Sequence, residues 1–179
     1  MKIVLDHISV KPLELNGDKA IELFPALLEA QVAGECVFTA PVSYSLAASK
    51  EFGHIRVSGD VKTSVQMCCS RCLVEYESKI SSYFTIIFRK GIVDSGFTED
   101  ETELSEDDLI SSVYSGDEID LTHDIEEQVA MAIPLKPLCE ESCKGLCPEC
   151  GVDFNKSSCR CTEKAFNFKF SALKDFKVK

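Results

Sequence analysis

Long runs of apolar and β-branched residues dominate the first half of the chain, and in several of them apolar and polar positions alternate. Such runs span residues 2–10, 32–49, 54–68 and 73–90. Period-two alternation with β-branched enrichment predicts β-strands. The last two runs predict a hairpin with a Cys-Ser-Arg-Cys sequence at its tip. Consecutive long strands predict an antiparallel sheet that curls or closes into a barrel-like form.

Helical periodicity is confined to two stretches. Residues 19–30 could form an amphipathic helix that Pro25 interrupts. Residues 122–133 give the clearer pattern, because Ile125, Val129 and Ile133 fall on one face and Pro134 follows directly. The fold class expected is therefore α+β: mostly antiparallel β, with one or two helices and a C-terminal cysteine-rich, zinc-binding segment.

Charge and composition divide the 179 residues into four regions. Residues 1–90 are β-rich and balance ten acidic with ten basic side chains, and residues 91–108 form an acidic loop. Residues 109–138 supply a strand and a helix that complete the domain. Residues 139–179 hold the cysteine-rich segment and a basic, aromatic tail. The net charge of −11 comes from one segment, since residues 91–127 carry fourteen acids and no Lys or Arg.

This charge map suggests two kinds of partner. The acidic segment disfavours phosphate and could hold a basic protein. The C-terminal part combines basic residues with phenylalanines, a pattern suited to RNA through charge and base stacking, although the aromatic rings could equally pack onto the sheet. The candidate RNA-binding residues are Lys156, Arg160, Lys164, Lys169, Lys174 and Lys177.

The expected location is the cytoplasm, with no membrane partner. Residues 1–10 lack the pattern of a secretory signal, and no stretch of the sequence approaches the roughly 18–20 apolar residues that span a bilayer. Cytosolic thiols stay reduced, so the ten cysteines point to metal binding rather than to disulfides.

Eight of the cysteines form four closely spaced pairs, namely Cys69/Cys72, Cys139/Cys143, Cys147/Cys150 and Cys159/Cys161. A two-residue gap lets both sulfurs of a turn face one ion, and four thiolates complete a tetrahedral zinc site. Pro148 and Gly151 favour such a turn, because proline fixes φ and glycine permits a positive φ. The pairs therefore predict two zinc ions per chain, with Cys36 and Cys68 left over. Filling every position with sulfur indicates structural rather than catalytic zinc.

Two groupings of the pairs are open. In the favoured one, Cys147/Cys150 join Cys159/Cys161, and Cys69/Cys72 join Cys139/Cys143, which would fasten the hairpin tip to the segment after the helix. In the rival grouping, the Cys139/Cys143 and Cys147/Cys150 pairs share one ion, and the hairpin pair is free or redox-active.

No catalytic motif accompanies the cysteines. His7, His54 and His123 lie beside no recognisable nucleophile or base pattern, and the sequence has no phosphate-binding loop and no Gly-x-Ser-x-Gly. We therefore expect no enzymatic activity and no small-molecule substrate. The alternative is a thiol-redox or zinc-handling protein that uses Cys69 and Cys72, which would require a labile metal and an exposed thiol of low pKa.

Three segments together resemble the bacterial large ribosomal RNA subunit accumulation protein family, once catalogued as a domain of unknown function. They are CSRCLVEYES, IDLTHDIEEQVAMAIPLKPLC and CKGLCPECGVDFNKSSCRC with the SALKDF tail, and the likeness runs from about residue 55 to the C-terminus. It implies a non-enzymatic role in the accumulation or processing of large-subunit (23S) ribosomal RNA, with that RNA or a basic large-subunit protein as partner. Some relatives lack the last four cysteines, which implies two separable sites.

Overall fold

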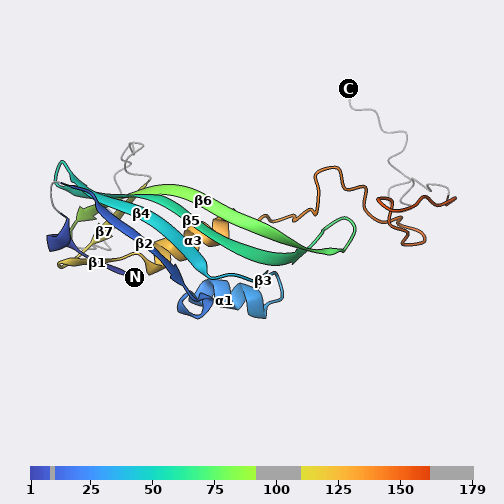
Figure 1. The fold of residues 1–179 in the computed structure, drawn as a ribbon, viewed down its shortest axis with the longest axis horizontal. Coiled ribbons are helices and arrows are strands. Elements are labelled where there is room, and N and C mark those ends of the chain that lie inside the picture. The colour runs from blue at the N-terminus through green and yellow to red at the C-terminus, as the bar shows by residue number, and fades with distance from the viewer. Residues whose placement is uncertain (9–10, 92–109, 162–179) are drawn as a thin grey trace, which may run out of the picture.

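One sheet organises the computed structural model, which describes residues 1–8, 11–91 and 110–161 (Figure 1). Its strand order is β2-β4-β5-β6-β7, and β3 also pairs with β5. The strands are β2 (Leu13–Lys19), β3 (Val37–Phe38), β4 (Val42–Glu51), β5 (His54–Cys68), β6 (Glu75–Lys90) and β7 (Ser111–Tyr114). The predicted β5–β6 hairpin is confirmed, with Ile55 opposite Phe88 and Cys68 opposite Glu75.

The sheet is open, so the barrel-like form was a wrong expectation. β2 and β7 lie at its two edges, and β7 pairs with β6 in parallel rather than antiparallel. Closure is not needed to bury the apolar face, because α1 (Pro25–Val32) and α3 (Thr122–Ala132) lie along it (Figure 1). A separate two-stranded ribbon of β1 (Lys2–Val4) and β8 (Glu118–Asp120) completes the described elements of sheet.

Three expected elements differ in the structure, and proline explains two of them. Residues 19–30 do not form one helix: β2 ends at Lys19, a 3-10 turn follows at Ile21–Leu23, and Pro25 begins α1, where its missing N–H costs nothing. The run at 32–49 is split into β3 and β4, because Pro41 cannot donate to the ladder. The run at 2–10 forms β1 and a 3-10 turn at Leu5–His7 rather than one long strand, and its last two residues lie outside the described part.

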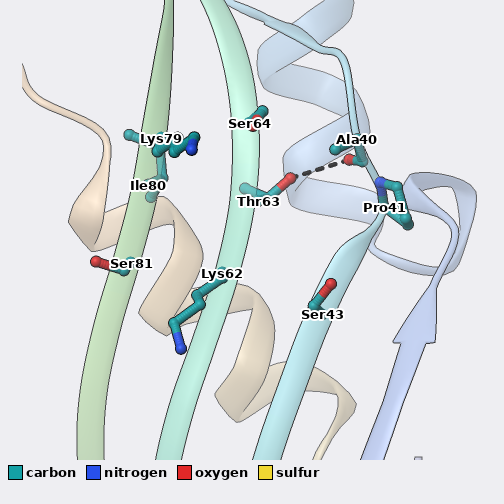
Figure 2. Close-up of a pocket in the computed structure, with 9 residues that line it drawn as sticks. All are labelled: Ala40, Pro41, Ser43, Lys62, Thr63, Ser64, Lys79, Ile80 and Ser81. Atoms are coloured by element: carbon teal, nitrogen blue, oxygen red, sulfur yellow. Dashed lines mark hydrogen bonds between the residues drawn. The ribbon is translucent and has the colours of Figure 1, made fainter.

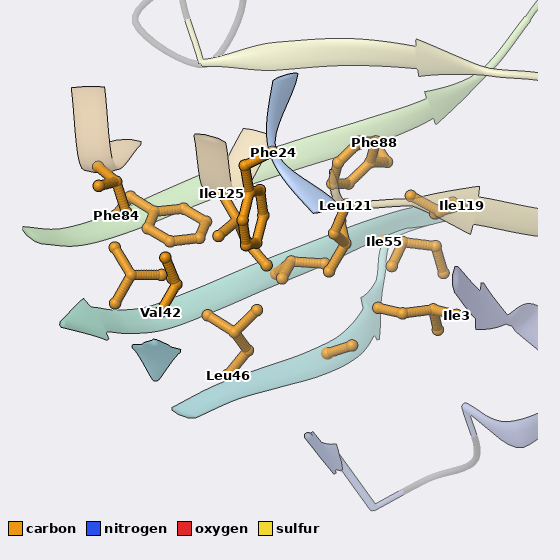
Figure 3. Close-up of a cluster of buried hydrophobic side chains, with 14 of the residues drawn as sticks. Ile3, Phe24, Val42, Leu46, Ile55, Phe84, Phe88, Ile119, Leu121 and Ile125 are labelled. Carbon is orange, nitrogen blue, oxygen red and sulfur yellow. The ribbon is translucent and has the colours of Figure 1, made fainter. Parts of the chain in front are cut away.

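The core lies between the sheet and the helices (Figure 3). α3 contributes Ile125 and Val129, which confirms two of the three residues predicted for its apolar face, whereas Ile133 follows the helix and packs against a smaller cluster. Phe24 lies just before α1, and Leu27 lies in its first turn. Each fully buried side chain of this size contributes roughly 1.5–3 kcal/mol. The strands supply Val42, Leu46, Val57, Val61, Phe84 and Phe88. None of the described helices is long and apolar enough to cross a bilayer.

A carboxylate of α3 joins the two helices. Glu126 is 7% exposed, and its Oε1 accepts hydrogen bonds from the backbone N–H groups of Ala26 and Leu27. These N–H groups belong to the first turn of α1, which has no intrahelical partner for them. Glu126 therefore caps a helix other than its own.

The far half of the β5–β6 hairpin projects beyond the main core (Figure 1). A smaller apolar cluster lies beneath it, made of Cys36, Val65, Met67 and Ile80. The hairpin tip therefore presents Cys69 and Cys72 at a distance from the helices, where the chain that follows α3 can reach them.

Candidate metal centres

The tip of the hairpin is a tight turn over residues 69–74. Its backbone is closed by two hydrogen bonds: Leu73 N–H donates to the Cys69 carbonyl at 2.9 Å, and Cys69 N–H donates to the Val74 carbonyl at 2.9 Å. Leu73 has a φ of 57°, which is uncommon outside glycine. This turn brings the Cys69 and Cys72 thiols to one side.

A second turn over residues 147–152 has the same two backbone hydrogen bonds as the first. Gly151 N–H donates to the Cys147 carbonyl at 2.9 Å, and Cys147 N–H donates to the Val152 carbonyl at 2.8 Å. Gly151 has a φ of 73°, which confirms the positive φ expected from its place after Cys150. The chain therefore contains two copies of one local geometry, each with a cysteine pair on its inner side.

Four sulfurs meet at the hairpin tip, and we call Cys69, Cys72, Cys139 and Cys143 the first cluster. Its ligand atoms all lie within 4.8 Å of one another. The Cys69 and Cys143 sulfurs are 3.8 Å apart, and the Cys72 and Cys139 sulfurs are 3.6 Å apart. These spacings exceed the disulfide length of about 2.05 Å. They match the edge of about 3.8 Å expected for a tetrahedron with metal–sulfur bonds near 2.3 Å.

The second cluster consists of Cys147, Cys150, Cys159 and Cys161, whose sulfurs also lie within 4.8 Å of one another. Two clusters of four thiols could each hold a metal ion. The structure assembles the favoured grouping of pairs, not the rival one that joined Cys139 and Cys143 to Cys147 and Cys150. Cys36 is buried in the small apolar cluster and Cys68 is exposed, and neither belongs to a thiol cluster among the described residues.

The two clusters differ in exposure. Three cysteines of the first are buried and Cys139 is partly exposed, whereas in the second only Cys147 is buried. An ion in the second cluster would therefore be more accessible to a chelator than one in the first.

Backbone N–H groups favour a thiolate at the first cysteine of each turn. Burial raises the pKa of Cys69, but hydrogen bonds from the backbone of Cys139, Cys72 and Arg71 outweigh it and lower that pKa to about 6. The backbone of Cys150 and Glu149 likewise lowers the pKa of Cys147 to about 7. This is the donor geometry that a metal-bound thiolate requires.

Crowding has the opposite effect on one cysteine in each cluster. Burial and hydrogen bonding with the neighbouring thiols raise the pKa of Cys139 to about 12. Hydrogen bonding with Cys150 and Cys159, together with burial, raises the pKa of Cys161 to about 12. Four thiols this close resist full deprotonation unless a cation offsets their charge, so the clusters suit a divalent ion.

Arg71 fastens the C-terminal segment to the hairpin tip. Its Nη1 donates to the carbonyl oxygens of Glu141 at 3.1 Å and Cys143 at 2.8 Å. Its own carbonyl oxygen accepts from Leu146 N–H at 3.1 Å, and the neighbouring Ser70 N–H donates to the Pro137 carbonyl at 2.8 Å. The guanidinium of Arg71 is thus bonded to the backbone of the segment that carries Cys139 and Cys143.

Asn155 links the segments that carry the two clusters. Its Nδ2 donates to the Cys143 sulfur at 3.4 Å and to Asp153 Oδ1 at 2.8 Å, while its Oδ1 accepts from Lys144 N–H at 2.8 Å. Sequence reasoning missed this residue, since an asparagine in GVDFNKSS carries only a turn signal. Its position eight residues after Cys147, in the loop between the cysteine pairs, was the one available hint.

The candidate RNA-binding residues are only partly covered by the structure. Lys156 is exposed, and its Nζ lies 3.7 Å from Asp153 Oδ2, while Arg160 is exposed beside the second cluster. Both therefore project from the cysteine-rich segment. The remaining four fall outside the described residues, namely Lys164, Lys169, Lys174 and Lys177.

The acids of the described part of residues 91–127 are partly used inside the molecule. Glu118 pairs with Lys2 at 3.0 Å, and Glu126 caps α1. His123 Nε2 lies 3.1 Å from Glu127 Oε1. This reduces the negative charge that residues 110–127 can offer to a basic partner.

A hollow of about 330 Å³ lies where β4 begins, beside β5 and β6 (Figure 2). Lys62, Lys79 and several serine hydroxyls line it, and Thr63 donates to the Ala40 carbonyl at 2.9 Å within it. Its lining residues include no carboxylate, histidine or cysteine.

Comparison with known proteins places this arrangement in a family. The family described as "Large ribosomal RNA subunit accumulation protein YceD" matches residues 57–177, which cover the hairpin, α3 and both clusters. The chain belongs to this family. The resemblance inferred from the three sequence segments is thus confirmed.

Individual relatives are more distant. The "Large ribosomal RNA subunit accumulation protein YCED homolog 1, chloroplastic" of Arabidopsis thaliana is 27% identical over 140 residues, covering 68% of this chain and 44% of the relative. The protein of the same name from Zea mays is 27% identical over 142 residues, covering 68% and 48%. An uncharacterized protein of Mycobacterium tuberculosis is 34% identical over 98 residues, covering 55% and 44%. The matched part spans about half the length of these relatives, and no solved structure matches the chain significantly.

Proposed function

We propose that this protein is a non-enzymatic factor that supports accumulation of large-subunit (23S) ribosomal RNA and contains two structural zinc ions. One ion fastens its C-terminal segment to the hairpin tip of the sheet, and the other closes a loop within that segment. The observation that carries the proposal is the pair of four-sulfur clusters within a chain of the YceD family. Sulfur-only, tetrahedrally spaced ligands favour zinc over magnesium or calcium, which prefer oxygen. A reduced compartment such as the cytoplasm suits free thiols of this kind.

Zinc would supply folding energy rather than chemistry. In zinc-finger peptides a structural ion contributes about 10–16 kcal/mol. The cysteine-rich segment needs such a contribution, because residues 134–161 form no helix and only an isolated bridge between Leu146 and Asp153. The ions would hold this segment, with its exposed Lys156 and Arg160, in a fixed place on the hairpin tip.

The partner we infer is ribosomal RNA, met by the basic C-terminal part. Lys156 and Arg160 are exposed, and both lie in the part of the chain that the second cluster closes, which favours phosphate contact. A basic ribosomal protein is the alternative partner, although internal pairing of Glu118 and Glu126 lowers the charge available to hold it.

The thiol-redox or zinc-handling alternative fits the geometry less well. That function needs an exposed thiol of low pKa. The pKa of Cys69 is low, at about 6, because backbone N–H groups outweigh the effect of its burial. However, Cys69 is 0% exposed and its sulfur faces Cys143 rather than solvent. Rapid alkylation of Cys69 in the zinc-loaded protein would revive this alternative.

Deletion of the gene tests the role in ribosome assembly. We expect large-subunit ribosomal RNA to fall relative to small-subunit RNA, and the wild-type gene to restore it. A C69S/C72S variant, which removes half of the first cluster, should fail to restore it, whereas a C36S variant should succeed because Cys36 is in no cluster. Unchanged RNA ratios in the deletion strain would contradict the proposed function.

Salt dependence tests the RNA contact. Each phosphate contact on single-stranded nucleic acid contributes about −0.7 to the slope of log affinity against log salt. We therefore expect K156A/R160A to flatten that slope by about 1.4. The matched control is K62A/K79A, which removes two lysines from the sheet and should leave the slope unchanged. If only K62A/K79A changes the slope of log affinity against log salt, the RNA contacts the sheet rather than the cysteine-rich segment.

A further inference from the structure

Asn155 belongs to the loop of one cluster but contacts a ligand of the other. It follows Cys147 and Cys150 and precedes Cys159 and Cys161, so both ends of its loop are fixed when the second cluster closes. Its Nδ2 nevertheless donates to the Cys143 sulfur at 3.4 Å, and Cys143 is a member of the first cluster. The second cluster thus positions a hydrogen-bond donor for a sulfur of the first.

The loop is built to hold this side chain in place. Asp153 Oδ1 accepts from the Asn155 backbone N–H at 2.9 Å and from Nδ2 at 2.8 Å. The hydrogen bond from the Asn155 backbone, and then the one from its side chain, lower the pKa of Asp153, so its carboxylate stays charged near neutral pH. Phe154 N–H donates to the Gly145 carbonyl at 2.9 Å, which ties the loop to the strand-like segment before Cys147.

Asn155 also contacts the backbone next to Cys143. Asn155 Oδ1 accepts from Lys144 N–H at 2.8 Å, so one amide group bonds the side chain of Cys143 and the peptide that follows it. On the opposite side, Arg71 Nη1 holds the Cys143 carbonyl at 2.8 Å. Cys143 is therefore fixed between the hairpin tip and the loop of the second cluster.

We propose that Asn155 is a positioning residue that couples the two metal sites, so that an ion in the second cluster raises the affinity of the first. This rests on the metal binding put forward under the proposed function. An ion at Cys147, Cys150, Cys159 and Cys161 restricts the loop that carries Asn155, and a preorganised donor costs less to place against Cys143. Partners of metal ligands of this kind typically change affinity by about 10–100-fold.

Coupling between two sites is reciprocal for binding free energies. If the second ion raises the affinity of the first site by some factor, the first ion must raise the affinity of the second by the same factor. The resemblance to relatives that lack the last four cysteines suggested two separable sites, and coupling predicts that in this chain they are not independent.

The test uses the full chain, stripped of metal, and Co²⁺ as the probe, whose thiolate charge-transfer absorbance reports each site. The second site is disabled with C159S/C161S and the first with C69S/C72S. We expect C159S/C161S to weaken Co²⁺ binding at the first site about 10-fold or more. Removal of the first site should weaken the second by the same factor.

Asn155→Ala tests whether that residue carries the coupling. In the intact chain it should weaken the first site by about 10-fold. Added to C159S/C161S it should cost little more, because the loop is already released. Loss of the hydrogen bond should also shift the charge-transfer band of the first site to lower energy, since the Cys143 thiolate becomes a better electron donor. A fold defect alone would not produce that shift.

Asn16→Ala is the matched control, because Asn16 lies exposed on β2 and contacts neither cluster. It should leave both affinities and both spectra unchanged. If the remaining site in C159S/C161S and in C69S/C72S keeps its full affinity, the coupling is overturned while metal binding stands. Absence of Co²⁺ binding in the intact chain would instead overturn the proposed metal sites themselves.

Discussion

Leu73 and Gly151 occupy the same position in the two cysteine turns. Each donates its backbone N–H to the carbonyl of the first cysteine of its turn at 2.9 Å, and each has a positive φ, 57° for Leu73 and 73° for Gly151. The first turn thus has a leucine at this position, whereas the second has glycine, the residue that a positive φ favours. A left-handed conformation costs a non-glycine residue about 1–2 kcal/mol.

Leu73→Gly should therefore stabilise the metal-loaded protein. Relief of the backbone strain exceeds the extra chain entropy of glycine, about 0.5–1 kcal/mol, and Leu73 is 64% exposed, so little burial is lost. We expect a gain of about 0.5–1 kcal/mol in the free energy of unfolding, measured by chemical denaturation. Gly151→Ala should cost about 0.5–1 kcal/mol by the same reasoning.

Leu73→Ala is the control, because alanine keeps the strain and should change stability little. A Leu73→Gly variant that is destabilised as much as Gly151→Ala would show that the two turns are not equivalent.

Substitution of Arg71 should loosen the first cluster. Its Nη1 bonds two carbonyl oxygens of the segment that carries Cys139 and Cys143. Arg71→Ala should lower the metal affinity of the first cluster about 10-fold, measured by competition with a chelator. Arg71→Lys should recover only part of this, since the lysine side chain is one bond shorter than the path to Nη1, which bonds both oxygens.

Arg56→Ala is the matched variant for this experiment, because Arg56 pairs with Glu51 on the sheet at 2.9 Å and contacts no cysteine. It should leave the affinity unchanged. Full recovery by lysine would indicate that the positive charge matters and the hydrogen-bond geometry does not.

Removal of the Glu126 carboxylate should destabilise the junction of α1 and α3. Glu126→Ala leaves the Ala26 and Leu27 N–H groups without their acceptor, at an expected cost of about 1–3 kcal/mol in the free energy of unfolding. The adjacent Glu127 is 57% exposed and pairs with the exposed His123, so Glu127→Ala should cost less than about 1 kcal/mol. Equal effects of the two substitutions would rule out the capping role.

The sequence was most informative where local chemistry decides the structure. Alternation predicted the β5–β6 hairpin, the helical period predicted α3, and the spacing of cysteines predicted the four pairs from which the structure assembles two clusters. The positive φ of Gly151 followed from its place after a cysteine pair. In each case the residues involved are close in sequence or share one repeated pattern.

Contacts between distant residues were not predictable in this way. Glu126 caps a helix that begins about a hundred residues earlier, and Arg71 contacts carbonyls seventy residues later. Pro25 was expected to interrupt a helix, whereas it begins one. β7 pairs with β6 in parallel, and the apolar–polar pattern of so short a strand does not distinguish parallel from antiparallel pairing.

Metal binding should release protons and weaken as the pH falls. Burial raises the pKa of Cys139 to about 12, and hydrogen bonding with neighbouring thiols raises that of Cys161 to about 12, so both are protonated in the metal-free protein at neutral pH. A metal-bound thiolate must lose that proton, and acid therefore competes with the ion.

Calorimetry of zinc binding in buffers of different ionisation enthalpy measures this release. We expect at least one proton per site at pH 7, and tighter binding at higher pH. The more exposed second cluster should also lose its ion first when a chelator is added. Zinc binding without proton release would contradict thiol ligation.

The metal content of untreated, reduced protein is the most direct test of the account, which holds that one ion fastens the C-terminal segment to the hairpin tip and a second orders the loop within that segment. We predict two zinc ions per chain by elemental analysis, and one ion in either C69S/C72S or C159S/C161S. Correctly folded protein that contains no transition metal would contradict the account. One ion per chain, lost entirely in C159S/C161S and kept in C69S/C72S, would contradict the first site.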